Sequence, residues 1–283
     1  MPPGFVSVPG MKTSAISSII LFMVTSINSV SPAFAVMAAS SDKSRYDICL
    51  DMAERTPDRA INEALIWQNE QGGIPARHCE ALGLFYLKEY REAAARLEKI
   101  AEDMRIGRGM PTRRGTRQTA TASMLADMYA QAANAWLLAD EIAAAETAID
   151  IAMSLSVNGS SQELELLIDR ARIAAADEDF ALALKDLQTV QNRDPGRKNI
   201  LVLIAAAARG SGQLVLAEQA LNEYQSLFPN DIDGHLERGN LHDVLGNLSA
   251  ARISWRKVLE LSEMGPSADA ARANLERIDL AGQ

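Results

Sequence analysis

The residues of this chain that could carry out chemistry are few and far apart. Its 283 residues include three histidines and two cysteines. His235 and His242 are seven residues apart in a segment with helical periodicity, whereas metal-binding histidines on one helix are three or four residues apart. The acidic run Asp177-Glu178-Asp179 lies at an expected turn, where carboxylates are solvated or cap the next helix. We therefore predict no catalytic residues, no metal site and no cofactor, and expect the protein not to be an enzyme.

Residues 1–35 have the layout of a secretory signal peptide. They contain one charged side chain, Lys12, followed by a short apolar run and a small-residue sequence that ends at Ala35. The apolar run is too short for a membrane-spanning helix, which needs about 20 residues. We predict translation from Met11, cleavage after Ala35, a periplasmic or secreted location, and no transmembrane segment in the mature chain. A signal anchor that stays uncleaved is the alternative.

The two cysteines, Cys49 and Cys79, become disulfide candidates if the chain is exported, because disulfides persist outside the cytoplasm. A bond between them would close a loop that includes the weakest part of the repeat pattern and contribute about 2–4 kcal/mol of stability. Two buried thiols are the alternative.

Residues 105–122 form a basic segment with no acidic side chain. Its arginines are Arg105, Arg108, Arg113, Arg114 and Arg117. Glycine and proline interrupt helical periodicity in its first part. The segment could contact an acidic partner, anionic lipid or glycan, and a solvated loop is the alternative. Nucleic acid is not predicted, because the segment lacks stacking aromatic residues.

The composition favours packed helices. Hydrophobic residues make up 48% of the chain, enough for a core, whereas aromatic residues make up 5%, which does not favour a β-sandwich. The formal net charge is −9, which argues against a general nucleic-acid-binding protein.

A 34-residue period organises residues 164–263. Ala183, Ala217 and Ala251 are 34 residues apart, a second small residue stands 12 positions before each of them, and apolar residues stand four and seven positions after each. In antiparallel helix pairs, small residues let helices cross closely and apolar residues at helical spacing fill the seam. Looser copies of the same pattern precede this region.

The pattern resembles the tetratricopeptide repeat, in which small and aromatic residues recur at these positions and a proline ends each unit. The resemblance implies an all-α fold: a right-handed α-solenoid of stacked antiparallel helix pairs with a C-terminal capping helix, here of an exported bacterial type. We expect residues 1–35 to be the signal peptide, 36–72 a degenerate N-terminal helix pair, 73–104 repeat 1, 105–122 the arginine-rich insertion, 123–160 repeat 2, 161–196 repeat 3, 197–230 repeat 4, 231–264 repeat 5, and 265–283 the capping helix.

The resemblance also implies a function, because tetratricopeptide proteins typically hold a peptide or partner protein in the concave groove lined by their first helices. The groove candidates at these positions are Phe85, Tyr86, Asn134, Arg172, Arg209 and Asn240. Arg172 and Arg209 would bind a carboxylate of the partner, or nearby acids such as Asp243 would neutralise them. We expect a non-catalytic interaction scaffold of the bacterial envelope. The alternative is an envelope-binding module that uses the arginine-rich segment to contact anionic lipid or glycan.

Overall fold

A computed structural model describes residues 40–113 and 115–281 of the chain. The predicted signal peptide, residues 1–35, lies outside the described residues. The described residues form the following helices and strands: α3 (Ser40–Arg55), α4 (Pro57–Asn69), α5 (Gly73–Tyr86), α6 (Tyr90–Arg105), β1 (Thr112–Arg113), β2 (Thr116–Arg117), α7 (Ala122–Leu138), α8 (Ile142–Leu155), α9 (Ser161–Ala176), α10 (Phe180–Arg193), the short 3-10 helix η1 (Lys198–Ile200), α11 (Leu201–Gly210), α12 (Leu214–Leu227), α13 (Ile232–Val244), α14 (Leu248–Leu261) and α15 (Pro266–Ala281).

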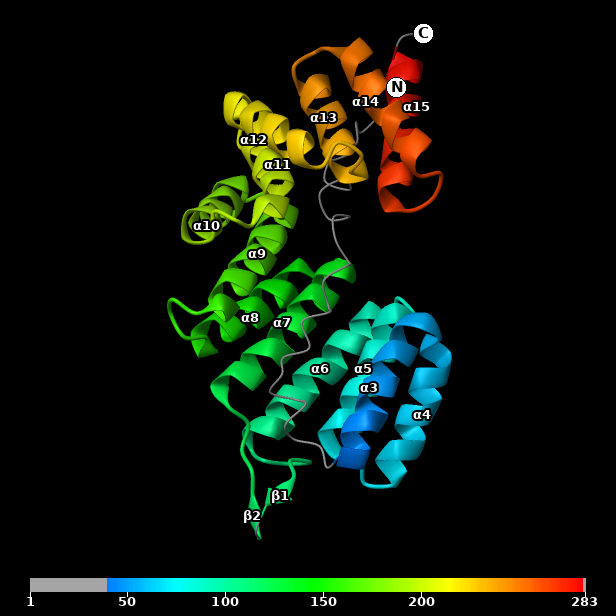
Figure 1. Cartoon of the computed structure of the whole chain (residues 1–283), viewed down its shortest axis with the longest axis vertical. Helices are drawn as coiled ribbons and strands as arrows, with labels where there is room; N and C mark the ends of the chain where they lie inside the picture. Colours follow the sequence, from blue (N-terminus) through cyan, green and yellow to red (C-terminus); the bar gives the residue numbers. More distant parts are fainter. Residues whose placement is uncertain (1–39, 114, 282–283) are drawn as a thin grey trace, which may run out of the picture.

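The helices pack as successive pairs, each formed by two neighbours in sequence, from α3 with α4 to α13 with α14. The pairs follow one another in an arc that runs from α4 through α10 to α15 (Figure 1). The first helices α7, α9 and α11 lie on the inner side of this arc, and the second helices α8, α10 and α12 lie on its outer side. The described chain is therefore an all-α solenoid, as the sequence predicted.

The 34-residue pattern matches the packing of the helix pairs. Ala183, Ala217 and Ala251 have no exposed surface, and Leu187 and Leu221, four residues after the first two alanines, are 2% exposed or less. A methyl group at the crossing point lets the second helix of each pair approach the first, so the larger neighbours can fill the seam between pairs.

The tight turn inside most pairs contains one residue in the left-handed conformation. In the two most regular repeats this residue is Gly212 or Gly246, with φ of 77° and 76°. The equivalent residues of the earlier repeats are Lys88, Asp140 and Glu178, with φ between 61° and 67°. Side chains other than glycine are strained in this region, so the earlier repeats keep the turn geometry at some cost in stability.

The hydrophobic core of the array has two main clusters, which meet at α9. Leu166 and Ile173 face the core shared with α3–α8, whereas Leu167, Ala171 and Ala174 face the core shared with α10–α15. α9 therefore connects the two halves of the solenoid through opposite sides of one helix.

The insertion between α6 and α7 forms a β-hairpin that projects from the array (Figure 1). Thr112 pairs with Arg117 and Arg113 pairs with Thr116 in antiparallel register. The two-residue connection includes Gly115 at φ 76°, as expected for a tight hairpin whose turn matches the strand twist. The hydroxyl of Thr121 then accepts a hydrogen bond from the amide of Met124 at 3.2 Å and caps the start of α7.

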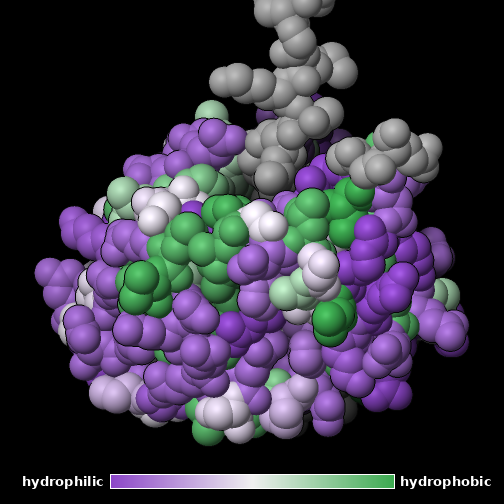
Figure 2. Space-filling view, turned by 90° about the horizontal axis from the view of Figure 1, so that it is seen from above, coloured by the Kyte–Doolittle hydropathy of each residue, from purple (hydrophilic) through white to green (hydrophobic). Residues whose placement is uncertain are grey.

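The last helix, α15, packs on α13 and α14 at one end of the array. Ala268, Ala271 and Ile278 form its buried side. Apolar side chains still lie between hydrophilic ones on this end of the molecule (Figure 2), and Ile253 and Leu280 are 70% and 65% exposed. Among the described helices, none is long and apolar enough to cross a membrane.

Candidate partner-binding site

The first helices of the repeats carry the residues that the sequence predicted for partner binding. Phe85 and Tyr86 lie on α5, Asn134 on α7, Arg172 on α9, Arg209 on α11 and Asn240 on α13. The structure brings four of these residues together in two pairs, Asn134 with Arg172 and Arg209 with Asn240. Each pair is organised by a carboxylate that the sequence analysis did not single out.

Phe85 does not offer its ring to a partner. Its side chain is 2% exposed, and its ring packs edge-on against Tyr86 and Tyr90, with centroids 5.7 Å and 5.3 Å away. The prediction that Phe85 lines the groove is therefore corrected: helix α6 supplies Tyr90, which covers the ring and makes it part of the core. Tyr86 is half-buried, and burial together with the charge of Glu54 raises its pKa.

Asp169 joins the first pair of predicted residues. Its carboxylate accepts a hydrogen bond from Arg172 at 2.7 Å and another from the side chain of Asn134. Burial raises the pKa of Asp169, while Arg172 and Asn134 act in the opposite direction. Arg172 and Asn134 thus hold a carboxylate of the protein itself between α7 and α9.

Glu237 joins the second pair. Its side chain has no exposed surface, and Arg209 binds both of its oxygens, at 2.5 Å and 3.1 Å. Asn240 donates to the same carboxylate at 3.3 Å and accepts a hydrogen bond from the indole of Trp255 at 3.2 Å. The acid that neutralises Arg209 directly is therefore Glu237, whereas Asp243, which the sequence suggested, forms an ion pair with Arg277.

The two carboxylates occupy one position of the repeat. Asp169 and Glu237 are two 34-residue periods apart, and each stands two residues before the small residue at which the helices cross. The equivalent residue of α7 is Gln131, which binds His78, and that of α11 is Leu203. A polar residue recurring at a fixed distance from the crossing position was the signal that could have revealed this site from sequence.

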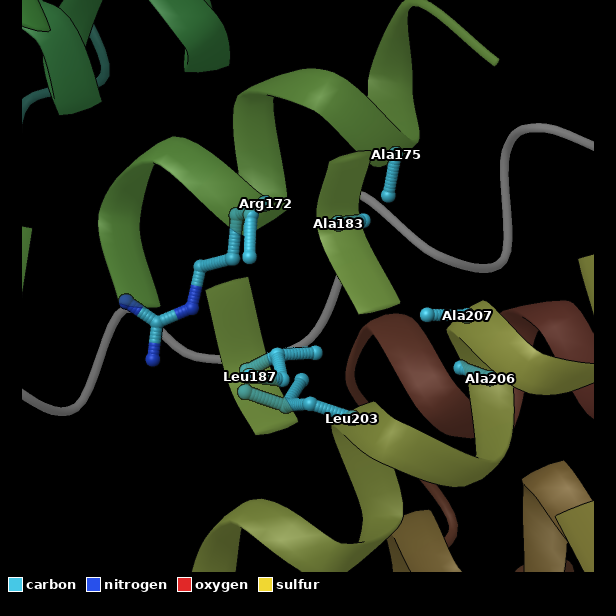
Figure 3. Close-up of a pocket in the computed structure, with 8 residues that line it drawn as sticks. Arg172, Ala175, Ala183, Leu187, Leu203, Ala206 and Ala207 are labelled. Carbon is cyan, nitrogen blue, oxygen red and sulfur yellow. The ribbon is translucent and has the colours of Figure 1, made fainter. Parts of the chain in front are cut away.

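A hollow separates the two carboxylate clusters. It lies between α9, α10 and α11 and has an empty volume of about 290 Å³, including the part that is open to solvent. Its lining consists of Ala171, Arg172, Ala175, Ala183, Leu187, Leu203, Ala206 and Ala207. Alanines from three helices face the same space, and the Arg172 side chain runs along one edge (Figure 3).

The arginines of the insertion differ in their surroundings. Arg108 and Arg77 both bind the buried carboxylate of Asp103 at 2.9 Å, which fastens the base of the hairpin to α5 and α6. Arg117 on β2 is exposed. Only the backbone of Arg113 is described, and Arg114 lies outside the described residues.

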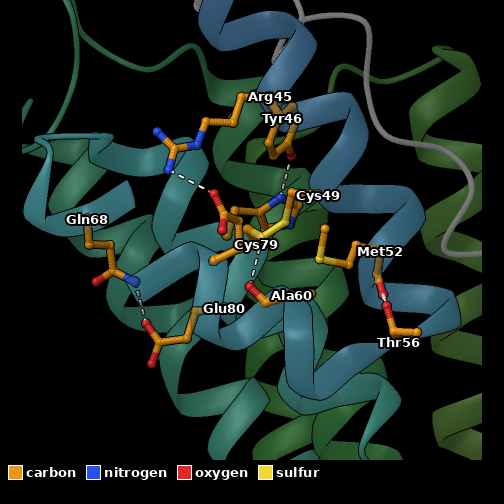
Figure 4. Close-up of a disulfide and its surroundings, with 11 residues drawn as sticks. Arg45, Tyr46, Cys49, Met52, Thr56, Ala60, Gln68, Cys79 and Glu80 are labelled. Carbon is orange, nitrogen blue, oxygen red and sulfur yellow. Dashed lines mark hydrogen bonds and ion pairs between the residues drawn. A yellow bond between two sulfur atoms is a disulfide. The ribbon is translucent and has the colours of Figure 1, made fainter. Parts of the chain in front are cut away.

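Cys49 on α3 and Cys79 on α5 form a disulfide, with Cα atoms 5.9 Å apart (Figure 4). This is the pairing that the sequence predicted. α3 and α5 are the first helices of neighbouring pairs and pack side by side, so the bond attaches the N-terminal pair to the next one. Leu82, 3% exposed, belongs to the same small core cluster.

A buried hydrogen-bonded chain runs beside the disulfide. The hydroxyl of Tyr46 on α3 lies 2.5 Å from Nδ1 of His78 on α5, and Nε2 of His78 lies 2.7 Å from the amide oxygen of Gln131 on α7. Burial lowers the pKa of His78 to about 4. The neutral ring donates from Nε2 to Gln131 and accepts at Nδ1 from Tyr46, so it connects three successive first helices.

The remaining candidates for chemistry have structural surroundings. Nε2 of His235 lies 2.9 Å from the carbonyl oxygen of Pro229. Burial, together with Arg238, lowers the pKa of His242. Asp179 accepts a hydrogen bond from the amide of Leu182 at 3.0 Å and caps α10, as the sequence suggested. Among the described residues, no group of three or more histidines, cysteines and carboxylates could hold a metal ion.

No family model and no curated protein matches the sequence. In structure the chain is similar to MamA from Desulfovibrio magneticus RS-1, at 18% identity and a TM-score of 0.48, with 71% of this chain and 95% of that chain covered. It is also similar to YrrB, described as a TPR protein with an unusual peptide-binding site, at 17% identity and a TM-score of 0.44, with 76% and 98% covered. The TPR2AB domain of yeast Sti1 in complex with pHSP90 is a further likeness, at 13% identity and a TM-score of 0.37, with 89% and 100% covered.

The class of the protein follows from its own architecture, since these likenesses are low in both identity and TM-score. Helix pairs recur every 34 residues from α9 to α14, small residues lie at their crossings, and the pairs stack into one arc. The chain is an all-α solenoid of the tetratricopeptide-repeat type.

Proposed function

We propose that this protein is a non-catalytic interaction scaffold of the bacterial envelope that holds a segment of a partner protein along the inner side of its arc. The observation that carries the proposal is the row of polar clusters on successive first helices, with a hollow between them. The polar side chains of these clusters bond one another, as when Asn240 accepts from both Trp255 and Asn274, and the hollow between the clusters opens to solvent. An extended surface built from repeated helices suits a peptide or protein better than a small molecule.

Site-specific photocrosslinking in cells tests this proposal. A photoreactive residue would replace Tyr86 or Asp243 on first helices, and Lys185 or Glu218, exposed on second helices, would serve as controls. We expect adducts of one common mass from the first-helix positions and none from the controls. Adducts from the control positions alone would place the partner on the outer side and contradict the proposal.

We further propose that the protein acts outside the cytoplasm, in the periplasm or as a secreted protein. The Cys49–Cys79 disulfide supports this location, because such bonds persist in oxidising compartments. The expected mature protein begins at Val36, which N-terminal sequencing of protein purified from the envelope can check. A mature chain that retains Met11 would count against export by cleavage.

A second candidate function is contact with anionic lipid or glycan through the hairpin. The observation that favours it is the projection of β1 and β2 from the array, with Arg117 exposed and no acid in residues 105–122. Arg108 contributes less, because Asp103 already holds its charge. Sedimentation with phosphatidylglycerol vesicles should weaken in Arg117→Gln, whereas equal sedimentation of this variant and the wild type would remove the hairpin from consideration.

A further inference from the structure

Among the four first helices α7, α9, α11 and α13, one position of the repeat is polar in three and apolar in α11. Gln131, Asp169 and Glu237 each hold a hydrogen bond that links two helices. Leu203 occupies the same position in α11 and has no group that could do so. Leu203 therefore interrupts this row of polar residues in the middle of the groove.

The hollow lies at this interruption. α7 packs directly on α9 and α11 packs on α13, whereas the backbones of α9 and α11 lie further apart and both helices pack on α10. The space between them is bordered by short side chains, chiefly Ala175 of α9 and Ala206 of α11, and Leu187 of α10 lies at its side (Figure 3). Short side chains border this space, so a shallow apolar depression opens to solvent between two neighbouring first helices.

The charges around the hollow are already balanced. Arg172 lies on its edge and binds Asp169 at 2.7 Å. Arg209, on α11 just after Ala206 and Ala207, binds Glu237 at 2.5 Å. Each guanidinium faces a carboxylate of the protein, so neither offers an unbalanced positive charge to an acidic ligand, and an ionised group that entered the apolar space would lose its hydration without gaining a partner.

We propose that the hollow between α9, α10 and α11 is a pocket for one uncharged aliphatic side chain, such as leucine, of the bound partner segment. This inference rests on the proposed function and specifies the chemistry of the partner. The segment anchors by burying this side chain, and its backbone lies between the Asp169 and Glu237 clusters. The arginines hold the walls of the pocket and do not clamp a carboxylate of the partner.

Capped amino acids test the pocket without knowledge of the partner. The purified protein is labelled at alanine methyl groups and titrated with N-acetyl-leucinamide, and in parallel with the α-amide of N-acetyl-aspartate, whose side chain is charged. We expect the methyl signals of Ala175, Ala206 and Ala207 to shift with the leucine probe, and the aspartate probe to bind at least about tenfold more weakly. Preference for the aspartate probe, or no shift of these methyl groups with either probe, would overturn the proposal.

A filled pocket gives a second test. Ala206→Leu places a branched side chain in the hollow and should abolish the shifts at Ala175 and Ala207. Ala181→Leu, at an exposed position of α10 that does not line the hollow, is the matched control and should leave them unchanged. Circular dichroism melting checks that both variants fold, and persistence of the shifts in folded Ala206→Leu would show that the probe binds elsewhere.

The pocket and the proposed function can fail separately. Crosslinks from the first helices without a response to the leucine probe would leave the groove in place and remove the pocket. If the leucine probe binds but the first helices form no crosslinks, the pocket exists but no cellular partner uses it. This result would contradict the proposal that the pocket holds an aliphatic side chain of a partner segment.

Discussion

Gly239 and Trp255 form a matched pair of a small and a large residue, and replacing Gly239 by alanine should destabilise the last repeat. A Cβ atom at position 239 would lie 2.3 Å from Nε1 and 2.4 Å from Cδ1 of Trp255, well inside contact distance. The indole has no exposed surface, and its N–H donates to Asn240, so the ring can move only by giving up packing and this hydrogen bond.

The magnitude follows from three contributions to the free energy of unfolding. Overpacking of a core costs about 1–3 kcal/mol, and loss of the indole hydrogen bond costs about 1 kcal/mol more. In the opposite direction, alanine stabilises a helix interior by about 1 kcal/mol relative to glycine. Gly239→Ala should therefore lower the stability by about 1–3 kcal/mol, measured by urea unfolding followed by circular dichroism.

The two preceding repeats show how the cost can be removed. At the same two positions they have Ala171 with Leu187 and Ala205 with Leu221. Trp255→Leu alone leaves a cavity next to Gly239, whereas the double variant Gly239→Ala/Trp255→Leu restores the combination used elsewhere in the array. The double variant should be more stable than the sum of the single changes indicates, by about 1–3 kcal/mol.

A glycine without close neighbours supplies the control. A Cβ atom at Gly196 would meet only a side-chain oxygen of Asp194 at 3.5 Å, so Gly196→Ala should be neutral or slightly stabilising. If Gly239→Ala is equally harmless, or if the Gly239 and Trp255 changes are strictly additive, the argument from complementary residue sizes is refuted.

Three further predictions concern buried groups. Cys79→Ser should loosen α3 and α4 and cost about 2–4 kcal/mol, seen as faster amide hydrogen exchange in that pair only; uniform exchange along the chain would contradict it. Burial lowers the pKa of His78 from 6.5 to about 4. Its contribution to stability is therefore complete above pH 6.5 and declines by about 3 kcal/mol as the pH falls towards 4, because only the unfolded chain takes up the proton. His78→Gln should flatten this pH dependence in urea titrations, and an unchanged pH profile would contradict the role of His78. Glu237→Ala leaves Arg209 buried without its partner and should cost about 3–5 kcal/mol, with partial recovery when Arg209 is also replaced; a thermal melt equal to that of the wild type would show that the pair is dispensable.

The fold could be predicted from sequence because its determinants repeat. Ala183, Ala217 and Ala251 are small for the same reason in three successive units, so their spacing alone identifies helix crossings. The disulfide was also within reach, since two cysteines in a chain predicted to be exported allow one intramolecular pairing. Repetition turns a weak local preference into a pattern that chance does not produce.

The groove was harder to predict because side-chain partners do not follow from spacing alone. Phe85 has the right position for the groove but turns into the core, since Tyr90 of the next helix covers it. Arg209 binds Glu237 between two first helices, and the spacing from Arg209 alone does not distinguish that partner from Asp243. The hollow depends on how far apart α9 and α11 lie, which is a property of helix packing rather than of any residue type.

The bond between α3 and α5 makes the two ends of the array unequal. In a linear array each unit is held mainly by its neighbours, so fraying starts at an end. At the N-terminal end of the described array the first pair is covalently attached through Cys49 and Cys79, whereas the described contacts of α15 are packing and polar contacts with α13 and α14. Fraying therefore proceeds from the C-terminal end. A protease that cut the turn between α4 and α5 would leave two fragments that migrate as one chain until the disulfide is reduced.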